Sequence, residues 1–459
     1  MNEANDRRPF PVCIFQGESK PSNLPEFLNP LIEEINELKT VGIVFQQRLL
    51  QFDYPNCLFI CDAPARAFVK SVKGHTGYYG CEKCECEGSR INFKLTYNSM
   101  DSTLRTDERF RRRIQEEHHN TPYQTEMSPL ELCGTGMVSQ FPLEYMHLVC
   151  LGVVKKFISL CLKGPLSVRL SANQVQEISA KLLACVPRIP TEFSRTPRDI
   201  QLYGRWKATE CRQFLLYTGP VILKNILRKP VYDNFMLLSA GIRILLQTDN
   251  SMYSCAEKFL DAFFRHYQQL FGEEHCVYNV HNIIHLANDA KTWGNLDRNG
   301  AFTFENELGS MKEMVRGLRL PLEQVYRRYK EAEAIPSCSQ NKQYPSLERP
   351  DGKGFFKQAS LPNFKIICDQ KNSYVGTHEK FVKVAKIYET EGGIVLEGTA
   401  LKISSDLFQY PIKSRMLGIV TARKTDKIIK VPLSSITVKF VALPLKHEVA
   451  LIPLCHTKL

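Results

Sequence analysis

The sequence predicts three successive kinds of structure: a mixed α/β region, a long all-helical region and a small all-β domain. Three observations support this. Short apolar runs accompany one amphipathic helix before about residue 100, helical periodicity dominates residues 106–334, and apolar and polar residues alternate after about residue 355. A chain of 459 residues can bury a large core, and we expect two or three domains.

The changes in pattern give the domain boundaries. We predict an α/β part at residues 1–100, a helical insertion at 101–280, closing helices at 281–335, a polar linker at 336–355 and a basic β-rich domain at 356–459.

The α/β part begins with a strand-like run, VCIFQG, followed by a helix in PEFLNPLIEEINELKTVGI. Asn23 is placed to cap this helix, and Pro25 falls in its first turn. The segment VFQQRLLQFDYPNCLFICD predicts two further strands, the last ending at Asp62, and AFVKSVK predicts a helix. A loop and short hairpin should fill residues 76–100.

Composition and charge limit the classes of protein to which this chain could belong. The chain has no apolar run near twenty residues, which argues against a membrane span, and its start lacks a secretory pattern. Its sixteen cysteines therefore indicate reduced thiols rather than a disulfide framework. Net charge is +12, and residues 346–459 hold 18 Lys or Arg against 10 Asp or Glu. This basic module slightly favours an acidic partner such as nucleic acid.

The strongest motif pair is a CxxC with a distant HxxxH. Cys81 and Cys84 would converge through a tight turn, and His281 and His285 would lie one helical turn apart. Four such donors predict a structural zinc site. Either half alone is weak, and Cys86 or His75 could replace one of the four ligands.

Two acids flank these motifs in the sequence. Asp62 lies nineteen residues before Cys81, and Glu305 lies twenty residues after His285. A pair of carboxylates can hold divalent metals for phosphodiester chemistry. Taken alone, Asp62 fits a helix N-cap at least as well, and Glu305 fits a solvated helix face.

Three further sets of residues could act on a metal or on DNA. Glu144 and His147 lie one turn apart and favour a packing pair. Lys207 and Arg212 follow Trp206 at a helix start and could contact phosphates, although a buried Trp with satisfied ion pairs fits about as well. The candidate DNA contacts in the β-rich domain are Lys424, Lys427 and Lys430.

Taken together, the motifs resemble the CACTA/EnSpm-type transposases of animal genomes. The segments that carry the resemblance are KPSNLPEFLNPLIEEINEL, CDAPARAFVKSVKGHTGYYGCEKCECEG, RTDERF, PLEYMHLVCLGV, WKATECRQFLLYTGPVIL, YNVHNIIHL and AFTFENELGSMKEMVR. The resemblance runs from about Pro11 to Leu454.

The resemblance implies an RNase H-like DDE nuclease core interrupted by a helical insertion. It puts the second and third catalytic acids on Asp62 and Glu305, with Mg²⁺ or Mn²⁺ as the catalytic ion. The CxxC and HxxxH spacing is also similar to the zinc-binding insertion of the V(D)J recombinase and its Transib relatives, which implies structural zinc. DNA would be the partner and the nucleus the location, and a homodimer is left open.

One difference from these transposases limits the activity that the resemblance implies. Such transposases carry a first catalytic Asp on an opening strand, before the region matched by PVCIFQGESKP, and this sequence offers no counterpart. We therefore expect an RNase H-like core that is incomplete at its N-terminus. Two hypotheses follow: a catalytically impaired enzyme of the DDE class, or a domesticated, non-catalytic, zinc-stabilised protein that binds DNA or protein.

Overall fold

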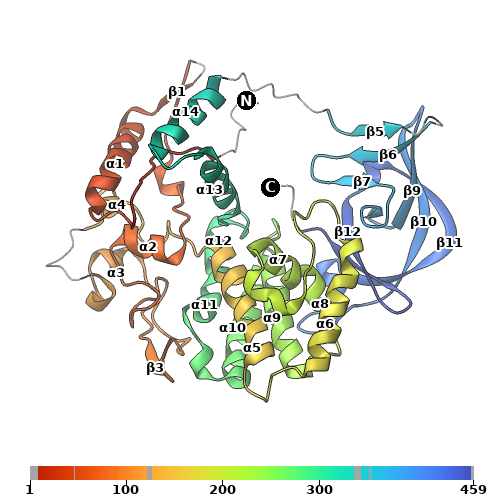
Figure 1. Cartoon of the computed structure of the whole chain (residues 1–459), viewed down its shortest axis with the longest axis horizontal. Helices are drawn as coiled ribbons and strands as arrows, with labels where there is room; N and C mark the ends of the chain where they lie inside the picture. Colours follow the sequence, from red (N-terminus) through yellow and green to blue (C-terminus); the bar gives the residue numbers. More distant parts are fainter. Residues whose placement is uncertain are drawn as a thin grey trace. The chain divides into compact units, whose positions relative to one another are not determined.

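The computed structural model describes residues 9–45, 47–120, 127–334, 343–350, 352 and 354–455. The chain divides into two compact units, and each unit is assembled from two separate segments (Figure 1). The first unit combines Met1–Leu148 with Glu273–Ser339, and the second combines Val149–Gly272 with Gln340–Leu459. The helical segment of the second unit is therefore narrower than the predicted insertion at 101–280.

The first unit is mainly helical. Its helices are α1 (Leu24–Val41), α2 (Ala63–Lys70), α3 (Asp107–Arg111), α4 (Pro129–Leu132), α11 (Tyr278–His281), α12 (Leu286–Trp293), α13 (Phe302–Met314) and α14 (Pro321–Ala334), with short 3-10 turns η1 (Tyr54–Asn56), η2 (Glu116–His118), η7 (Glu273–His275) and η8 (Asn282–His285). The predicted start of α1 is confirmed, because the Asn23 side chain accepts the Glu26 N–H at 3.1 Å.

Strands are few among the described residues of the first unit. They form two separate hairpins, β1 (Ile43–Phe45) with β2 (Arg48–Leu50) and β3 (Ser89–Ile91) with β4 (Lys94–Thr96). The hairpin expected within residues 76–100 is confirmed. The strands expected at residues 12–17 and 57–62 are wrong, because neither segment forms a β-ladder with another strand of the described residues. An apolar run becomes a strand only where another strand satisfies its backbone groups.

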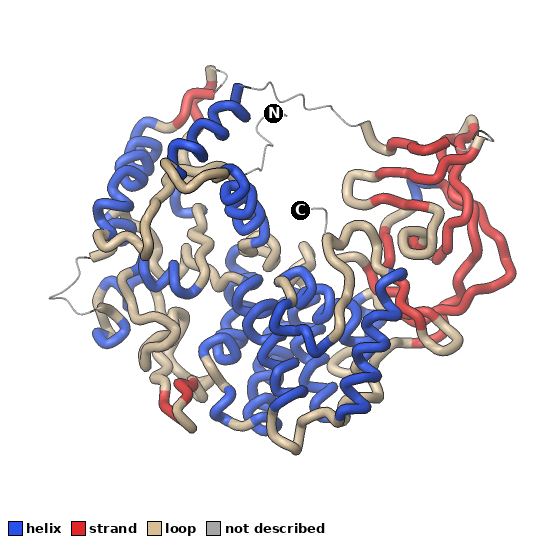
Figure 2. Tube along the Cα trace, viewed as in Figure 1, coloured by secondary structure: helices blue, strands red, loops and turns tan. Residues whose placement is uncertain are grey.

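The second unit joins a helical bundle to a β-barrel, which Figure 2 distinguishes by colour. The π-helical turn η3 (Met146–Val154) leads into it from the first unit. Its helices are α5 (Lys155–Lys163), α6 (Ala172–Cys185), α7 (Ala208–Gln213), α8 (Gly219–Ile222), α9 (Lys229–Leu245) and α10 (Tyr253–Phe271), with the short turns η4 (Val186–Arg188) and η5 (Ile200–Arg205) and the π-turn η6 (Phe214–Thr218). Ser171 caps α6 in a reciprocal capping box with Gln174. The predicted helical character of this segment is confirmed.

The C-terminal part is a closed antiparallel barrel of six strands. The order around the barrel is β8, β9, β10, β11, β13 and β12, and β12 pairs with β8 to close it. The strands are β8 (Tyr374–Gly376), β9 (Phe381–Thr390), β10 (Gly393–Ser405), β11 (Val420–Pro432), β12 (Val438–Pro444) and β13 (Val449–Pro453). Short turns η9 (Ser414–Leu417) and η10 (Leu433–Ser435) connect some of them. Closure leaves no unpaired barrel edge.

Three additional strands extend from β9. They are β5 (Ser346–Pro350), β6 (Phe355–Ser360) and β7 (Lys365–Ile367), and β6 pairs with both β5 and β7. The predicted linker at 336–355 is therefore wrong at its C-terminal end, which contains β5 and the start of β6. Its residues 336–342 lie outside the described part of the chain.

Buried polar contacts fix the barrel to the helices within the second unit. Lys439 on β12 and Glu192 are almost fully buried and approach to 2.8 Å. The Lys439 ammonium also donates to Asn372 Oδ1 at 2.9 Å. Asn372 Oδ1 in turn accepts the Thr191 N–H at 3.0 Å. Because each buried charge is paired, this contact can hold the two parts in one arrangement.

Candidate metal centre

The four predicted metal ligands meet in the first unit. The side chains of Cys81, Cys84, His281 and His285 are buried, and their ligand atoms all lie within 4.8 Å of one another. The two sulfurs are 3.5 Å apart. Nε2 of His281 lies 3.3 Å from the Cys84 sulfur, and Nε2 of His285 lies 3.7 Å from the Cys81 sulfur. The arrangement could hold a metal ion.

The two alternative ligands are excluded by their positions. Cys86 is buried but donates its thiol toward the Glu87 carbonyl at 3.6 Å. His75 is exposed, and its ring lies 6.0 Å from the ring of Tyr278. Neither belongs to the cluster.

The cysteine loop is shaped by a close approach of backbone. A Cβ on Gly80 would lie 2.4 Å from the Gly74 carbonyl oxygen and 2.6 Å from the Tyr97 hydroxyl, so only glycine fits immediately before Cys81. Tyr97 itself donates its hydroxyl to the Gly77 carbonyl. Its backbone N–H donates to the Cys276 carbonyl at 2.8 Å, which ties the loop to the segment that leads into the histidines.

The histidines lie on continuous helical backbone formed by α11, η8 and α12. Between them, Asn282 is fully buried and donates to the Tyr278 carbonyl at 2.9 Å. Its Oδ1 lies 3.7 Å from the Cys81 sulfur. Asn282 was not predicted from the sequence as a neighbour of the cluster. The one sequence signal that could have identified it is its position between the two histidines.

Charged residues inside the CxxC motif anchor the loop to the rest of the unit. Glu82 is 3% exposed and pairs with Arg66 and Lys70, each at 2.8 Å. Burial opposes ionisation of Glu82, but the two cations lower its pKa to about 2. Lys83 pairs with Asp289 on α12 at 2.7 Å, which links the cysteine loop to the helix that follows the histidines. Within the motif, the two cysteines of the cluster therefore enclose two charged residues that form buried ion pairs.

The electrostatics of the cluster favour a thiolate at Cys81 rather than at Cys84, because the contact between the two sulfurs raises the pKa of Cys84. Burial opposes ionisation of Cys81, but its contacts with Cys84, His281 and His285 lower its pKa well below the usual thiol range. A thiolate is the form of cysteine that binds metal ions.

The two candidate acids both belong to the first unit but make different contacts. Asp62 caps α2 by accepting the Ala65 N–H at 2.7 Å. Glu305 on α13 lies 3.7 Å from Nε2 of His147. The hydrogen bond to Glu144 has the largest effect on the pKa of His147 and raises it, burial opposes this rise, and the charges of Glu144, Asp62 and Glu305 add to it. Glu305 is thus placed beside His147, whereas Asp62 is engaged as the cap of α2.

Glu144 holds this imidazole in place. Its buried carboxylate accepts N–H groups from Met146, His147 and Ala301 at 2.6–2.8 Å, and it meets His147 Nδ1 at 2.7 Å. The expected packing role of this pair is consistent with these contacts. The sequence did not predict that Glu305 lies close to His147.

Across the described ranges, the Cys–His cluster is the one group of three or more potential metal ligands within ligand distance of one another.

The predicted DNA contacts lie in the second unit and differ in exposure. Lys207, Lys424, Lys427 and Lys430 are exposed. Arg212 is 6% exposed, which contradicts its assignment as a phosphate contact. Trp206 is also buried and packs against Phe214, and Glu210 pairs with Arg198, so the alternative of a buried Trp with satisfied ion pairs describes this segment.

Comparison with known proteins gives one partial match. Residues 340–454, which include the barrel, match the model of a domain family described as a domain of unknown function (DUF8592). No curated protein and no solved structure matches the chain. Among the helices that the structure describes, none is long and apolar enough to cross a membrane.

Proposed function

We propose that the chain is a transposase-derived protein of the DDE class, stabilised by structural zinc and catalytically impaired. Its ancestral activity would be metal-dependent DNA strand cleavage and transfer. The observation that carries the proposal is the buried cluster of Cys81, Cys84, His281 and His285, which joins the two chain segments that also hold Asp62 and Glu305. A DDE-class site likewise depends on acids that are far apart in the sequence.

Zinc fits the donors and their spacing. With Zn–S bonds of about 2.3 Å and Zn–N bonds of about 2.0–2.1 Å, tetrahedral geometry puts sulfurs about 3.8 Å apart and sulfur and nitrogen about 3.6 Å apart. The observed separations of 3.5 Å and of 3.3 and 3.7 Å are close to these values. Four protein ligands leave no open position, which is typical of structural rather than catalytic zinc.

The proposal also includes an RNase H-like core as the origin of the first unit. Its support is local: the segment that ends at Cys61 leads into Asp62 at the start of α2, and Glu305 lies 3.7 Å from Nε2 of His147. If Mg²⁺ or Mn²⁺ binds, these two carboxylates would hold it, and the ion would supply a metal-activated water or hydroxyl. Within the described residues the central sheet of such a core is not formed.

The contacts of the two acids favour impaired catalysis. Asp62 is engaged as a helix cap and Glu305 faces His147, while no third carboxylate of the described residues completes a metal-binding group with them. The same observation supports the second candidate function, a domesticated, non-catalytic, zinc-stabilised protein that binds DNA or protein.

DNA is the proposed partner, and its contacts would lie on the barrel. Lys383 on β9 and Lys424 on β11 flank β10, where Lys383 pairs with Thr399 and Lys424 with Leu401. Burial lowers the pKa of Lys383, and the nearby charges of Lys424 and Arg188 lower it further. Such a cluster of cations is suited to phosphate. Lys430 is less available to a phosphate, because its ammonium lies 3.7 Å from the Glu397 carboxylate. A DNA partner would make the nucleus the site of action, and a homodimer remains part of the proposal.

A DNA nicking and binding assay tests the proposal. The chain should bind duplex DNA at low salt and lose affinity as salt rises, with little or no Mg²⁺- or Mn²⁺-dependent nicking. The variants Asp62→Asn and Glu305→Gln should leave this behaviour unchanged, as should the control Asp101→Asn at an exposed carboxylate. Efficient nicking abolished by Asp62→Asn would overturn the impaired state, and absence of DNA binding at low salt would overturn the DNA-directed function.

A further inference from the structure

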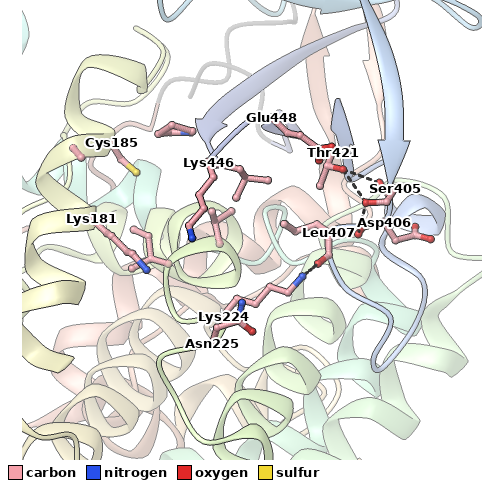
Figure 3. Close-up of a pocket in the computed structure, with 15 residues that line it drawn as sticks. Lys181, Cys185, Lys224, Asn225, Ser405, Asp406, Leu407, Thr421, Lys446 and Glu448 are labelled. Atoms are coloured by element: carbon pink, nitrogen blue, oxygen red, sulfur yellow. Dashed lines mark hydrogen bonds between the residues drawn. The ribbon is translucent and has the colours of Figure 1, made fainter. Parts of the chain in front are cut away.

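A pocket of about 570 Å³ lies within the second unit, between the helical bundle and one end of the barrel (Figure 3). Its helical wall comes from α6, α8 and the turn after α8, and its barrel wall comes from the ends of β10, β11 and β12. Pockets for small ligands typically measure about 300–1,000 Å³. The volume therefore fits a small organic molecule.

The walls of this pocket are held in place before any ligand arrives. The buried Lys439–Glu192 pair fastens the barrel to the helical segment. At the pocket itself, the Lys224 ammonium, on the helical wall, donates to the Leu407 carbonyl on the barrel wall, a contact drawn in Figure 3. A preformed pocket loses little conformational freedom when it binds a ligand.

Three lysines from three different elements line the pocket. Lys181 comes from α6, Lys224 follows α8, and Lys446 comes from the turn between β12 and β13. Figure 3 shows Lys181 and Lys446 extending from opposite walls into the same opening. Lys181 also pairs with Glu177 at 2.7 Å, but both side chains are about half exposed, and such a surface pair is worth little.

The carboxylates of the pocket are already neutralised. Asp406 accepts from the Arg415 side chain at 3.0 Å and from the Arg415 N–H at 2.8 Å. Glu448 pairs with Arg423 at 2.7 Å. Among the residues that the structure describes, no carboxylate lies within 4.0 Å of the Lys224 or Lys446 ammonium. The lysines therefore leave the pocket with an excess of positive charge.

The rest of the lining is mostly apolar. Ala184, Val221, Ile222, Leu407 and Leu445 form aliphatic surface, and the hydroxyls of Ser405 and Thr421 hydrogen-bond to each other at 3.0 Å on the barrel wall. Aliphatic walls with a few converging cations match a ligand that has an apolar body and an anionic head.

A second depression of about 350 Å³ continues from the first and shares Lys224 and Leu407 with it. It adds the aromatic side chains of Tyr232, Phe408 and Tyr410. Tyr410 is 37% exposed, so its ring can contact a ligand. Lys229 also lines the second depression, where it pairs with Asp233 and lies over the Tyr410 ring. The two depressions therefore offer three lysines without a buried carboxylate partner among the described residues at one end, and aromatic surface beside a neutralised ion pair at the other.

We propose that this groove binds a small organic phosphate, with the phosphoryl group held by Lys181, Lys224 and Lys446 and its apolar or aromatic body against the aliphatic and tyrosine walls. This binding is separate from the Cys–His cluster and from DNA binding by the barrel strands. The shared chemistry is a phosphate monoester, and its source could be a nucleotide or an alkyl phosphate.

Calorimetric titration of the full chain distinguishes the sources. Adenosine monophosphate, octyl phosphate, inorganic phosphate and adenosine are the four probes. Saturable binding of either monoester, with inorganic phosphate and adenosine much weaker, supports the proposal. Preference for adenosine monophosphate identifies a nucleotide, and preference for octyl phosphate identifies an alkyl phosphate. No saturable binding of either monoester overturns it.

Substitutions in the groove test whether the phosphate monoester binds there. The double variant Lys181→Gln with Lys446→Gln should weaken the preferred monoester by more than about tenfold, because charge-assisted hydrogen bonds are lost. Lys258→Gln, at an exposed position of α10 outside the groove, should not change it. If the double variant does not fold, Ala184→Glu at an exposed position of the wall should also reduce binding by introducing a carboxylate. Undiminished binding in folded variants of both kinds overturns the assignment to this groove.

Discussion

Removal of the proposed zinc ion should destabilise the first unit far more than the second. Cys84 and His281 are separated by 197 positions (281 − 84), so an unfolded chain must close a loop of that length to assemble the four donors. Loop-closure entropy for such a segment costs about 5 kcal/mol. A metal ion will therefore bind all four ligands only in the folded state, and its binding free energy becomes stability.

Linkage gives the expected size of the effect. At a free zinc concentration about 1,000 times the dissociation constant, binding to the native state alone contributes about 4 kcal/mol. Small domains are stable by about 5–15 kcal/mol, so this is a large part of the total. For a unit of this size we expect the unfolding temperature to fall by about 10 °C when the metal is removed.

Elemental analysis and thermal unfolding test this expectation together. The purified chain should contain one zinc per chain, and Cys81→Ser should lose the metal and the stability of the first unit. Cys86→Ser is a matched control, because Cys86 is equally buried but stands outside the cluster. Stability that is unchanged in Cys81→Ser, or a zinc-free native protein, would refute the reasoning.

Three further outcomes are expected. Lys424→Gln should weaken DNA binding and reduce the salt slope by about one in fluorescence anisotropy, whereas Lys430→Gln, whose ammonium lies near a carboxylate, should change it less. Glu82→Gln should destabilise the first unit by about 3–5 kcal/mol in denaturant unfolding, because its buried cations lose their partner. Glu144 raises the pKa of His147, so the charged imidazole stabilises the fold below the usual imidazole pKa, and this contribution is lost as pH rises through the raised value. Proton NMR should show a lower pKa for His147 in Glu144→Gln, and an unchanged value would contradict this assignment.

The sequence predicted those features whose signals are local. Asn23 before a periodic run marked the start of α1, and the alternating pattern after residue 355 marked antiparallel strands. The four residues of the Cys–His cluster were also identifiable, because a CxxC and a distant HxxxH together indicate a metal site although either motif alone is weak. The closed six-stranded order of the barrel was not, since strand order depends on pairing between distant segments.

Other features depend on surroundings that a local pattern does not contain. The apolar runs at residues 12–17 and 57–62 looked like strands, but a strand requires a partner strand, and no described strand pairs with either segment. Arg212 was proposed as a phosphate contact because it follows Trp206 and Lys207 at a helix start, yet it is buried. His147 looked like a packing residue, and only the fold brought Glu305 to it.

The division of the metal ligands follows the division of the first unit. That unit is interrupted by Val149–Gly272, which belongs to the second unit, and two ligands lie on each side of the interruption. The buried Lys83–Asp289 pair and the backbone bond from Tyr97 to Cys276 cross the same interruption. Neither segment of the first unit alone contains a complete metal site or a complete set of these contacts. A metal ion at the cluster would therefore bind only after both segments have met, and it would stabilise the joining of the two segments rather than the fold of either one.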